Sequence, residues 1–168
     1  MINSTIRLAI TLLLLLLAQA LLFNNIQLSG YINPYVYILF ILLLPLEIPA
    51  AIVMILAFGA GLTFDLYSGS VGMHAFACTI AAFIRPYVLK ALAPREGYTL
   101  NAQPTMYNYG VRWFFIYAAI ITAVHHTALF FIEVFNILEI LRILLRTLLS
   151  TAFSLTFIML IEYYRKGR

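Results

Sequence analysis

GAGLTFDLYSGSVGMHAFA, residues 59–77, places one aspartate and one histidine, Asp65 and His74, in an otherwise apolar part of the chain. An ionisable residue inside a membrane span costs roughly 2.5–3.5 kcal/mol on insertion scales. Residues that carry such a cost serve chemistry, transport or assembly. The residues around 59–77 indicate whether Asp65 serves chemistry, transport or assembly.

The composition indicates that nearly the whole chain lies in a membrane. Of its 168 residues, 64% are hydrophobic and 10% are charged, and the mean hydropathy is +1.02. A soluble domain carries about 25% charged residues. Because a spanning helix needs about 20 residues, we expect an all-α membrane protein, a single integral membrane domain over residues 1–168. Its apolar stretches fit a bundle of about six transmembrane helices with short loops, with no soluble catalytic domain.

Apolar runs and helix-breaking residues give the expected helix ranges. Pro34 suits the first turn of a helix, and the two prolines of PLEIP, residues 45–49, exclude a continuous helix there. The first run resembles a signal peptide with a cleavage site at residues 18–20, but it continues through Phe23, so we expect an uncleaved helix. The expected helices cover residues 6–23, 34–44, 49–67, 71–92, 111–132 and 138–164.

The distribution of lysine and arginine predicts that both termini are cytoplasmic. With six helices, Arg7, the region 85–112 and the tail 165–168 fall on one side of the membrane. The loops on the other side, 24–33, 68–70 and 133–137, contain no lysine or arginine, which fits the positive-inside bias. Arg142 and Arg146 lie near the outer end of the last helix, so we expect them to have a structural or functional role.

Two helix faces meet in the quoted stretch. Residues four apart lie on one side of a helix, and small residues at that spacing let another helix approach closely. The turn between the helices is short, so we expect an antiparallel hairpin with Asp65 and His74 near its outer end. The two faces are Ala57, Gly61 and Asp65 on the first helix, and His74, Ala77, Ala81 and Arg85 on the second.

Asp65 lies in the last turn of its helix, where the helix dipole disfavours an anion. We therefore expect a cationic partner, with His74, Arg142 and Arg146 as candidates and Arg142 favoured. Such a pair would hold the last helix against the hairpin. A proton or ion relay through Asp65 and His74, and a polar contact with a partner protein or ligand, are the alternatives.

The remaining polar residues give little indication of catalysis or metal binding. His125 and His126 point about 100° apart on a helix, and His126 with Glu133 supplies only two ligands, so we expect interhelical hydrogen bonds and no metal site. No phosphate-binding loop, nucleophile elbow or pair of carboxylates for acid–base catalysis occurs. The sequence therefore favours a protein that is not an enzyme and holds no cofactor, with an intramembrane enzyme as the weaker alternative.

Two polar segments on the cytoplasmic side could contact a soluble partner. Glu47 lies in the turn between two prolines, and the loop 94–110 is rich in tyrosine and contains Arg95 and Tyr98. The alternative is that these are ordinary solvated loops.

The hairpin motif resembles the signature of the MreD family, the rod-shape-determining membrane proteins of bacteria. In that family a glycine-bearing helix ends in Asp-Leu, and a Ser-Gly turn, a glycine and a basic residue follow. The segment Asn33-Pro34-Tyr35 and the PLEIP turn also fit, so the resemblance covers about residues 33–85. The matching residues are Gly61-Leu62, Asp65-Leu66, Ser68-Gly69-Ser70, Gly72 and His74-Ala75-Phe76-Ala77.

The resemblance implies a non-enzymatic subunit of the cell-elongation machinery, or elongasome, in the bacterial inner membrane. Its partners would be membrane lipid, an MreC-like periplasmic scaffold, MreB filaments and peptidoglycan synthases, and no nucleic acid. Its role would be cell-shape maintenance and lateral peptidoglycan synthesis. The residues expected to serve structure or assembly are Gly61, Asp65, Gly69, Gly72, His74, Arg142 and Arg146.

A second hypothesis is a substrate-binding subunit of a small-molecule importer, similar to the S-components of energy-coupling-factor transporters. Those are six-helix bundles whose first helix carries an Ala-x-x-x-Ala face. Here Ala9 and Ala18 lie far apart in a run of leucines, which counts against it. A ligand site needs convergent polar groups, and the sequence offers them only around Asp65, His74 and Arg142.

Overall fold

The computed structural model describes residues 4–23, 33–99 and 102–166, and over these ranges the protein is all-helical with seven α-helices and no strand. Two 3-10 turns, η2 (Val36–Ile38) and η3 (Ile137–Glu139), precede α2 and α7. The helices are α1 (Ser4–Leu21), α2 (Leu39–Leu43), α3 (Ala50–Ser68), α4 (Met73–Ala91), α5 (Met106–Tyr109), α6 (Val111–Val134) and α7 (Ile140–Lys166).

Three helical segments in the described ranges are long and apolar enough to cross a membrane: Ala50–Ser68, Val111–Val134 and Ile137–Arg165. They mark the chain as a multi-pass membrane protein, as its composition predicts. Large apolar side chains also remain exposed on the outside of the bundle, where lipid would cover them. Among the most exposed are Leu13, Leu14, Leu21, Ile55, Leu66, Leu141 and Leu148.

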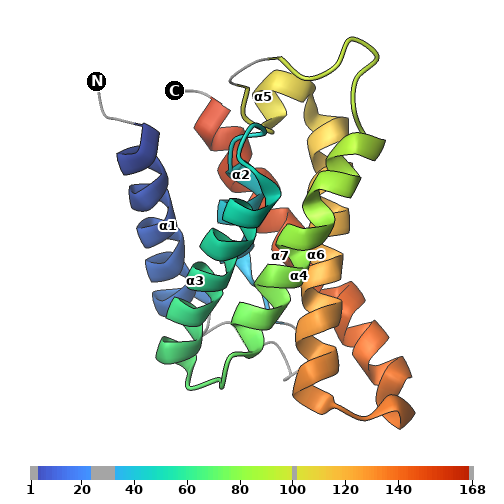
Figure 1. The fold of residues 1–168 in the computed structure, drawn as a ribbon. Coiled ribbons are helices and arrows are strands. Elements are labelled where there is room, and N and C mark those ends of the chain that lie inside the picture. The colour runs from blue at the N-terminus through green and yellow to red at the C-terminus, as the bar shows by residue number, and fades with distance from the viewer. Residues whose placement is uncertain (1–3, 24–32, 100–101, 167–168) are drawn as a thin grey trace.

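The long helices pack in chain order. α3 contacts α4, α4 contacts α6, and α6 contacts α7, while α1 contacts η2, α2 and α3 (Figure 1). The first turn of α1 and the last turn of α7 lie at one end of the molecule, together with α5. The α3–α4 turn and η3 lie at the opposite end (Figure 1).

A short buried segment, residues 36–44, occupies the centre of the bundle. Each of its residues is at most 3% exposed. At 1.5 Å per residue it is far too short to cross a bilayer as a helix. The helix expected over residues 34–44 is therefore replaced by extended backbone at 33–35, the 3-10 turn η2 and the five-residue helix α2.

Side chains from neighbouring helices satisfy the backbone where this central segment begins. Gln19 of α1 donates from Nε2 to the Pro34 carbonyl at 2.8 Å, and its Oε1 accepts from the Val36 amide at 2.7 Å. On α7, the Ser150 and Ser154 hydroxyls accept from the amides of residues 33 and 35 at 3.1 and 2.9 Å. Irregular backbone at membrane depth persists only where such partners exist.

Arg85 and Tyr117 satisfy the other end of the central segment. Arg85 is 3% exposed; it donates to the Leu44 carbonyl and, from Nε, to the Tyr117 hydroxyl at 2.9 Å. Tyr117 in turn donates to the Leu42 carbonyl at 3.2 Å. The expectation that Arg85 contributes to the cytoplasmic excess of positive charge is therefore wrong, because its guanidinium lies inside the bundle.

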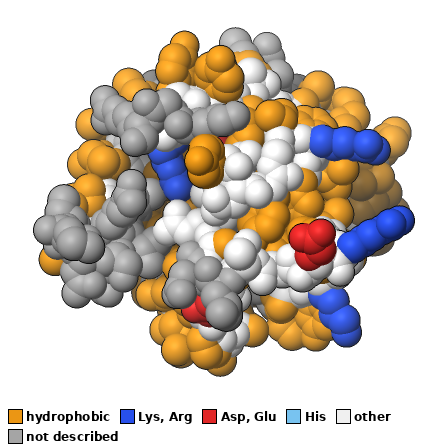
Figure 2. Space-filling view, turned by 90° about the horizontal axis from the view of Figure 1, so that it is seen from above, with side chains coloured by type: hydrophobic (Ala, Val, Ile, Leu, Met, Phe, Trp, Pro, Cys, Tyr) orange, Lys and Arg blue, Asp and Glu red, His pale blue; other side chains and the backbone are white. Residues whose placement is uncertain are grey.

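The described parts of the loop, residues 94–99 and 102–110, lie against the helix ends. They contain α5, and the Tyr98 ring packs between Tyr109 and Trp113, with ring centroids 5.2 and 6.1 Å away. Burial raises the pKa of Tyr98 to about 12, so its hydroxyl remains protonated and donates to the Leu89 carbonyl at 2.5 Å. Figure 2 views this end of the molecule, where lysine and arginine side chains gather along one edge and another lies further in. The exposed basic residues at the ends of α4, α6 and α7 and in the loop are Lys90, Arg112, Arg165 and Arg95.

Candidate functional site

The carboxylate of Asp65 caps the first turn of α4. Oδ1 accepts hydrogen bonds from the His74 amide at 3.0 Å and the Ser70 hydroxyl at 2.6 Å. Oδ2 accepts one from the Ala75 amide at 2.8 Å. Asp65 is 3% exposed, so both of its oxygens are committed to contacts inside the hairpin.

The expected ion pair between Asp65 and Arg142 is therefore wrong. The N-terminus of α4 supplies the positive end of a helix dipole together with free amide donors. The positive partner of Asp65 is thus the backbone of the next helix, and neither arginine is needed. Arg142 instead pairs with Glu139 at 3.0 Å, and Arg146 pairs with Glu133 at 3.0 Å.

Glycine residues permit the geometry of this cap. A Cβ atom on Gly61 would lie 2.6 Å from the Ala75 Cα and the His74 carbonyl oxygen, so only glycine lets α3 approach α4 this closely. Gly69 and Gly72 hold the turn with φ angles of 71° and 76°, which glycine adopts without strain. The close approach expected from the spacing of Gly61 and Asp65 is present.

A chain of buried hydrogen bonds links α4 to α6 through the central segment. The Tyr37 hydroxyl lies 2.9 Å from Nδ1 of His74 and 2.9 Å from Nε2 of His125. The Cys78 thiol donates to the same hydroxyl at 3.6 Å. Because the hydroxyl has one proton, it can donate to only one of the two imidazoles, and the histidine tautomers set the direction of each bond. Tyr37, which the sequence did not single out, is the centre of this network.

The adjacent histidine makes a separate contact. His126 Nδ1 lies 3.0 Å from the Thr151 hydroxyl of α7, and its ring stacks on Phe130 with centroids 5.6 Å apart. The guanidinium carbon of Arg146 lies 4.1 Å from the centre of that phenylalanine ring. His125 and His126 thus form interhelical hydrogen bonds as expected, one to the central segment and one to α7. In the described part of the chain, no group of three His, Cys, Asp or Glu side chains is arranged to hold a metal ion.

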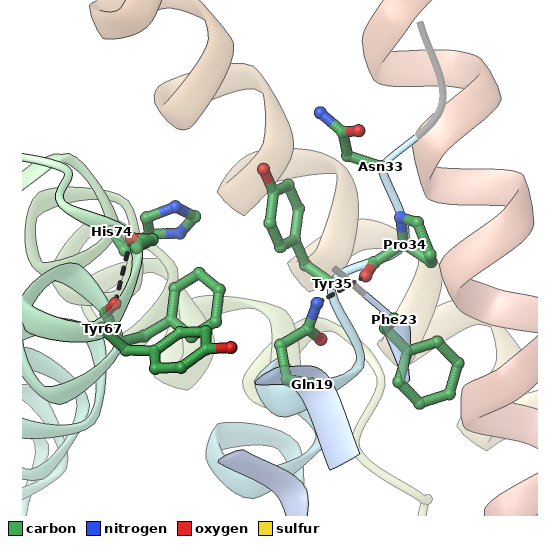
Figure 3. Close-up of a pocket in the computed structure, with 9 residues that line it drawn as sticks. Gln19, Phe23, Asn33, Pro34, Tyr35, Tyr67 and His74 are labelled. Carbon is green, nitrogen blue, oxygen red and sulfur yellow. Dashed lines mark hydrogen bonds between the residues drawn. The ribbon is translucent and has the colours of Figure 1, made fainter. Parts of the chain in front are cut away.

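Two hollows lie beside the hairpin, at the end of the molecule that carries the α3–α4 turn. The α1–α4 hollow has a volume of about 470 Å³ and is lined by Gln19, Phe23, Asn33, Pro34, Tyr35, Phe64, Tyr67, Ser68 and His74 (Figure 3). The α4–α7 hollow, of about 280 Å³, is lined by Asn33, Tyr35, Ser68, Ser70, Met73, His74, Leu129, Glu133 and Arg146. Tyr35 and His74 line both.

The expected assembly residues thus fall into two groups. Gly61, Asp65 and the turn glycines build the hairpin, and His74 connects it to the central segment. Arg146 reaches the rim of the α4–α7 hollow, whereas Arg142 is exposed beside Glu139, with 60% of its side chain accessible. Only the first group forms a contiguous site with Asp65.

The residues expected to contact a soluble partner lie in loops at the opposite end of the molecule. Glu47 and Arg95 are exposed. Tyr98 is half-buried, and its hydroxyl is used internally by Leu89. Of the three, Glu47 and Arg95 therefore offer charged side chains to a partner, and Tyr98 supports the loop.

Comparison of the whole chain with protein-family models, with curated proteins and with solved structures finds no match.

Proposed function

We propose that this protein is a non-enzymatic adaptor of the bacterial cell-elongation machinery, a multi-pass subunit of the inner membrane that binds an MreC-like periplasmic scaffold. The observation that carries the proposal is the use made of the residues that resemble the MreD signature. Gly61, Asp65, Gly69, Gly72 and His74 together build one rigid hairpin. Motif residues that fix the shape of a helix hairpin, and take no part in catalysis, fit a protein whose role is to assemble with partners.

The state of Asp65 supports a structural role over an acid–base role. A general acid or base must exchange a proton with a substrate within hydrogen-bond reach. Both oxygens of Asp65 already accept hydrogen bonds from the amides of residues 74 and 75, and the side chain is 3% exposed. The proton or ion relay through Asp65 has no support from these contacts.

The proposed topology has six crossings and cytoplasmic termini. In support of it, exposed lysine and arginine residues gather at the end that holds the first turn of α1 and the last turn of α7. At the opposite end, Arg142 and Arg146 each lie beside a carboxylate. The extended residues 33–35, together with the central segment, would provide the second crossing. The positive-inside bias sets the orientation.

In this orientation the hairpin turn faces the periplasm, where a scaffold of the MreC type would bind. The exposed apolar faces of α1, α3 and α7 are available to lipid or to a single-span partner. Glu47 and Arg95 at the cytoplasmic end would meet MreB filaments, and peptidoglycan synthases would join through the assembled complex.

The proposal is tested by affinity purification of the intact protein from bacterial membranes in a gentle detergent. We expect a single-span periplasmic scaffold to co-purify, and Asp65→Asn to lower its recovery. Arg142→Gln is the matched control and should leave recovery unchanged, because Arg142 makes no contact with Asp65. Recovery of an ATPase complex, with no scaffold, would overturn the proposal.

The importer subunit remains a second candidate because of one observation, the α1–α4 hollow. Its volume falls within the roughly 300–1,000 Å³ typical of ligand sites. Under this reading, cells lacking the protein lose uptake of one solute while keeping their shape. Under the adaptor proposal, cells lacking the protein lose their shape and keep solute uptake.

A further inference from the structure

We propose that the α1–α4 hollow is a binding site for a small, uncharged, ring-bearing molecule, with His74 as its hydrogen-bonding anchor. This inference goes beyond the adaptor role and does not depend on it. It rests on three properties of the hollow: its lining, its position beside the hairpin, and the way in which the structure fixes the His74 ring.

The lining matches a flat molecule with a polar edge. Four aromatic side chains line the hollow: Phe23, Tyr35, Phe64 and Tyr67. The ring centroids of Phe64 and His74 lie 4.6 Å apart, with the rings packed edge to face. The other lining residues supply polar groups, among them the amides of Gln19 and Asn33 and the imidazole of His74 (Figure 3). Aromatic walls with a few placed polar groups are typical of sites for small molecules.

The charge of the lining selects against ions. None of the nine lining residues is a lysine, arginine, aspartate or glutamate. A charged ligand would lose its hydration there without meeting an opposite charge, which is costly. Arg146 and Glu133 line the neighbouring hollow and are paired with each other at 3.0 Å. The chemical class is therefore neutral and polar, such as a heteroaromatic amide or a nucleobase.

The structure holds His74 in place from three directions. Asp65 accepts a hydrogen bond from its amide, and Gly61 allows α3 to lie against its carbonyl. On the ring, Nδ1 is bonded to the Tyr37 hydroxyl, which is itself bonded to His125. Nε2 is thus the ring nitrogen left to bind a ligand. A group fixed in advance loses little entropy on binding, which raises affinity.

Tyr35 completes the site as a wall between the two hollows. Its backbone amide is held by the Ser154 hydroxyl at 2.9 Å, and its ring lies 5.1 Å from the ring of His74 and 6.3 Å from that of Phe64, at interplanar angles of 68° and 81°. Figure 3 shows His74 and Tyr35 projecting toward one another from α4 and from the segment before η2. These two rings already pack edge to face, so a ligand in the hollow would meet the sides of the rings that line it.

The test uses the full-length chain purified in detergent micelles and ligand-observed saturation-transfer NMR. The probes are two matched pairs: nicotinamide with nicotinate, and uracil with orotate. Each pair differs by a carboxylate that makes one member an anion. Empty micelles provide the background for partitioning of the probes into detergent.

We expect at least one neutral probe to bind, and its anionic counterpart to bind at least tenfold more weakly. His74→Ala should weaken the neutral probe about tenfold, which corresponds to about 1.4 kcal/mol. Ser68→Trp, a change at an exposed residue that lines the hollow, should abolish binding by filling the space. Thr63→Val is the matched control, because Thr63 lies on α3 but is exposed and outside the lining.

Melting temperatures in the same detergent establish that each variant is folded. If His74→Ala unfolds the protein, the loss of probe binding in Ser68→Trp still tests whether the hollow is the binding site. The proposal is overturned by neutral probes that bind no better than to empty micelles, by binding that survives Ser68→Trp, or by anions that bind as well as their neutral partners. Because the assay uses the purified chain alone, its result is independent of whether a scaffold co-purifies from membranes.

Discussion

Asp65 shows how a carboxylate can be stabilised in a membrane bundle without a cationic side chain. Its two oxygens accept two backbone amides and one hydroxyl. We expect Asp65→Asn to lower the free energy of unfolding by about 1–3 kcal/mol, and Asp65→Ala by more, because asparagine retains one acceptor oxygen and alanine none. Thermal unfolding of the purified variants in detergent measures this order.

Arg142→Gln is the informative control for this prediction. Arg142 pairs with Glu139 on the surface, and exposed pairs contribute about 0–1 kcal/mol. Its melting temperature should therefore stay close to that of the unmodified protein. If Arg142→Gln were as unstable as Asp65→Asn, the result would support an ion pair between Asp65 and Arg142, which the contacts of Asp65 argue against.

Gly61 and Gly59 give a matched pair of substitutions on one helix. Alanine at residue 61 would place its Cβ 2.6 Å from backbone atoms of α4, whereas nothing lies within 4 Å of a Cβ at residue 59. We expect Gly61→Ala to destabilise by about 1–3 kcal/mol through overpacking. Gly59→Ala should be neutral or stabilise by up to about 1 kcal/mol, because alanine has the higher helix propensity.

The two glycine variants are compared by their melting temperatures in the same detergent. Opposite signs for neighbouring glycines would show that the approach of α3 to α4, and not a general need for flexibility in α3, requires Gly61. Equal and small effects at both positions would mean that α4 can move away at little cost, and the rigid hairpin would then lose its basis.

At the scale of elements, sequence reasoning located what depends on composition and spacing. The apolar runs predicted an all-helical fold, and the four-residue spacing of Ala57, Gly61 and Asp65 predicted the face that α4 covers. The unfavourable dipole at the end of α3 also predicted a positive partner for Asp65. That partner is the N-terminus of α4 and not Arg142, because backbone amides are not visible as a residue type in the sequence.

The central segment was harder to predict for a similar reason. The apolar run from Val36 to Leu44 fits a regular helix, and its pattern does not show where such a helix gives way to irregular backbone. What shortens it is a set of distant partners, Gln19, Arg85 and Tyr117, which cap its two ends. Their roles depend on tertiary contacts. A polar residue within a leucine run, as Gln19 is, would have been the available signal.

The caps of the central segment should act as a unit. We expect Arg85→Met to destabilise the protein by about 1–3 kcal/mol, because it removes the donor to the buried Leu44 carbonyl and to the Tyr117 hydroxyl. Tyr117→Phe should cost about 0.5–1.5 kcal/mol. Since Arg85 donates to Tyr117 at 2.9 Å, the double variant should depart from additivity by at least about 0.5 kcal/mol.

A double-mutant cycle based on denaturant unfolding measures this coupling. Lys90→Met, an exposed change at the end of the same helix, controls for removal of a positive charge from α4. Strict additivity would indicate that the two side chains cap the carbonyls of α2 independently.

At the scale of the whole molecule, the proposed orientation follows from the separation of charges between the two ends of the bundle. Val71 in the α3–α4 turn is 96% exposed, and Glu96 in the loop after α4 is exposed at the opposite end. In a Cys78→Ala background, we expect a membrane-impermeant maleimide to label Val71→Cys in cells whose outer membrane is permeable to the reagent. Glu96→Cys should react only after the inner membrane is opened, because the positive-inside bias keeps its basic neighbours in the cytoplasm. Cys78 itself is fully buried, so the background substitution removes a thiol that is already inaccessible. The reverse labelling pattern would show that the bundle has the opposite orientation, with the hairpin and both hollows on the cytoplasmic side. A periplasmic scaffold could then not be the partner of this turn.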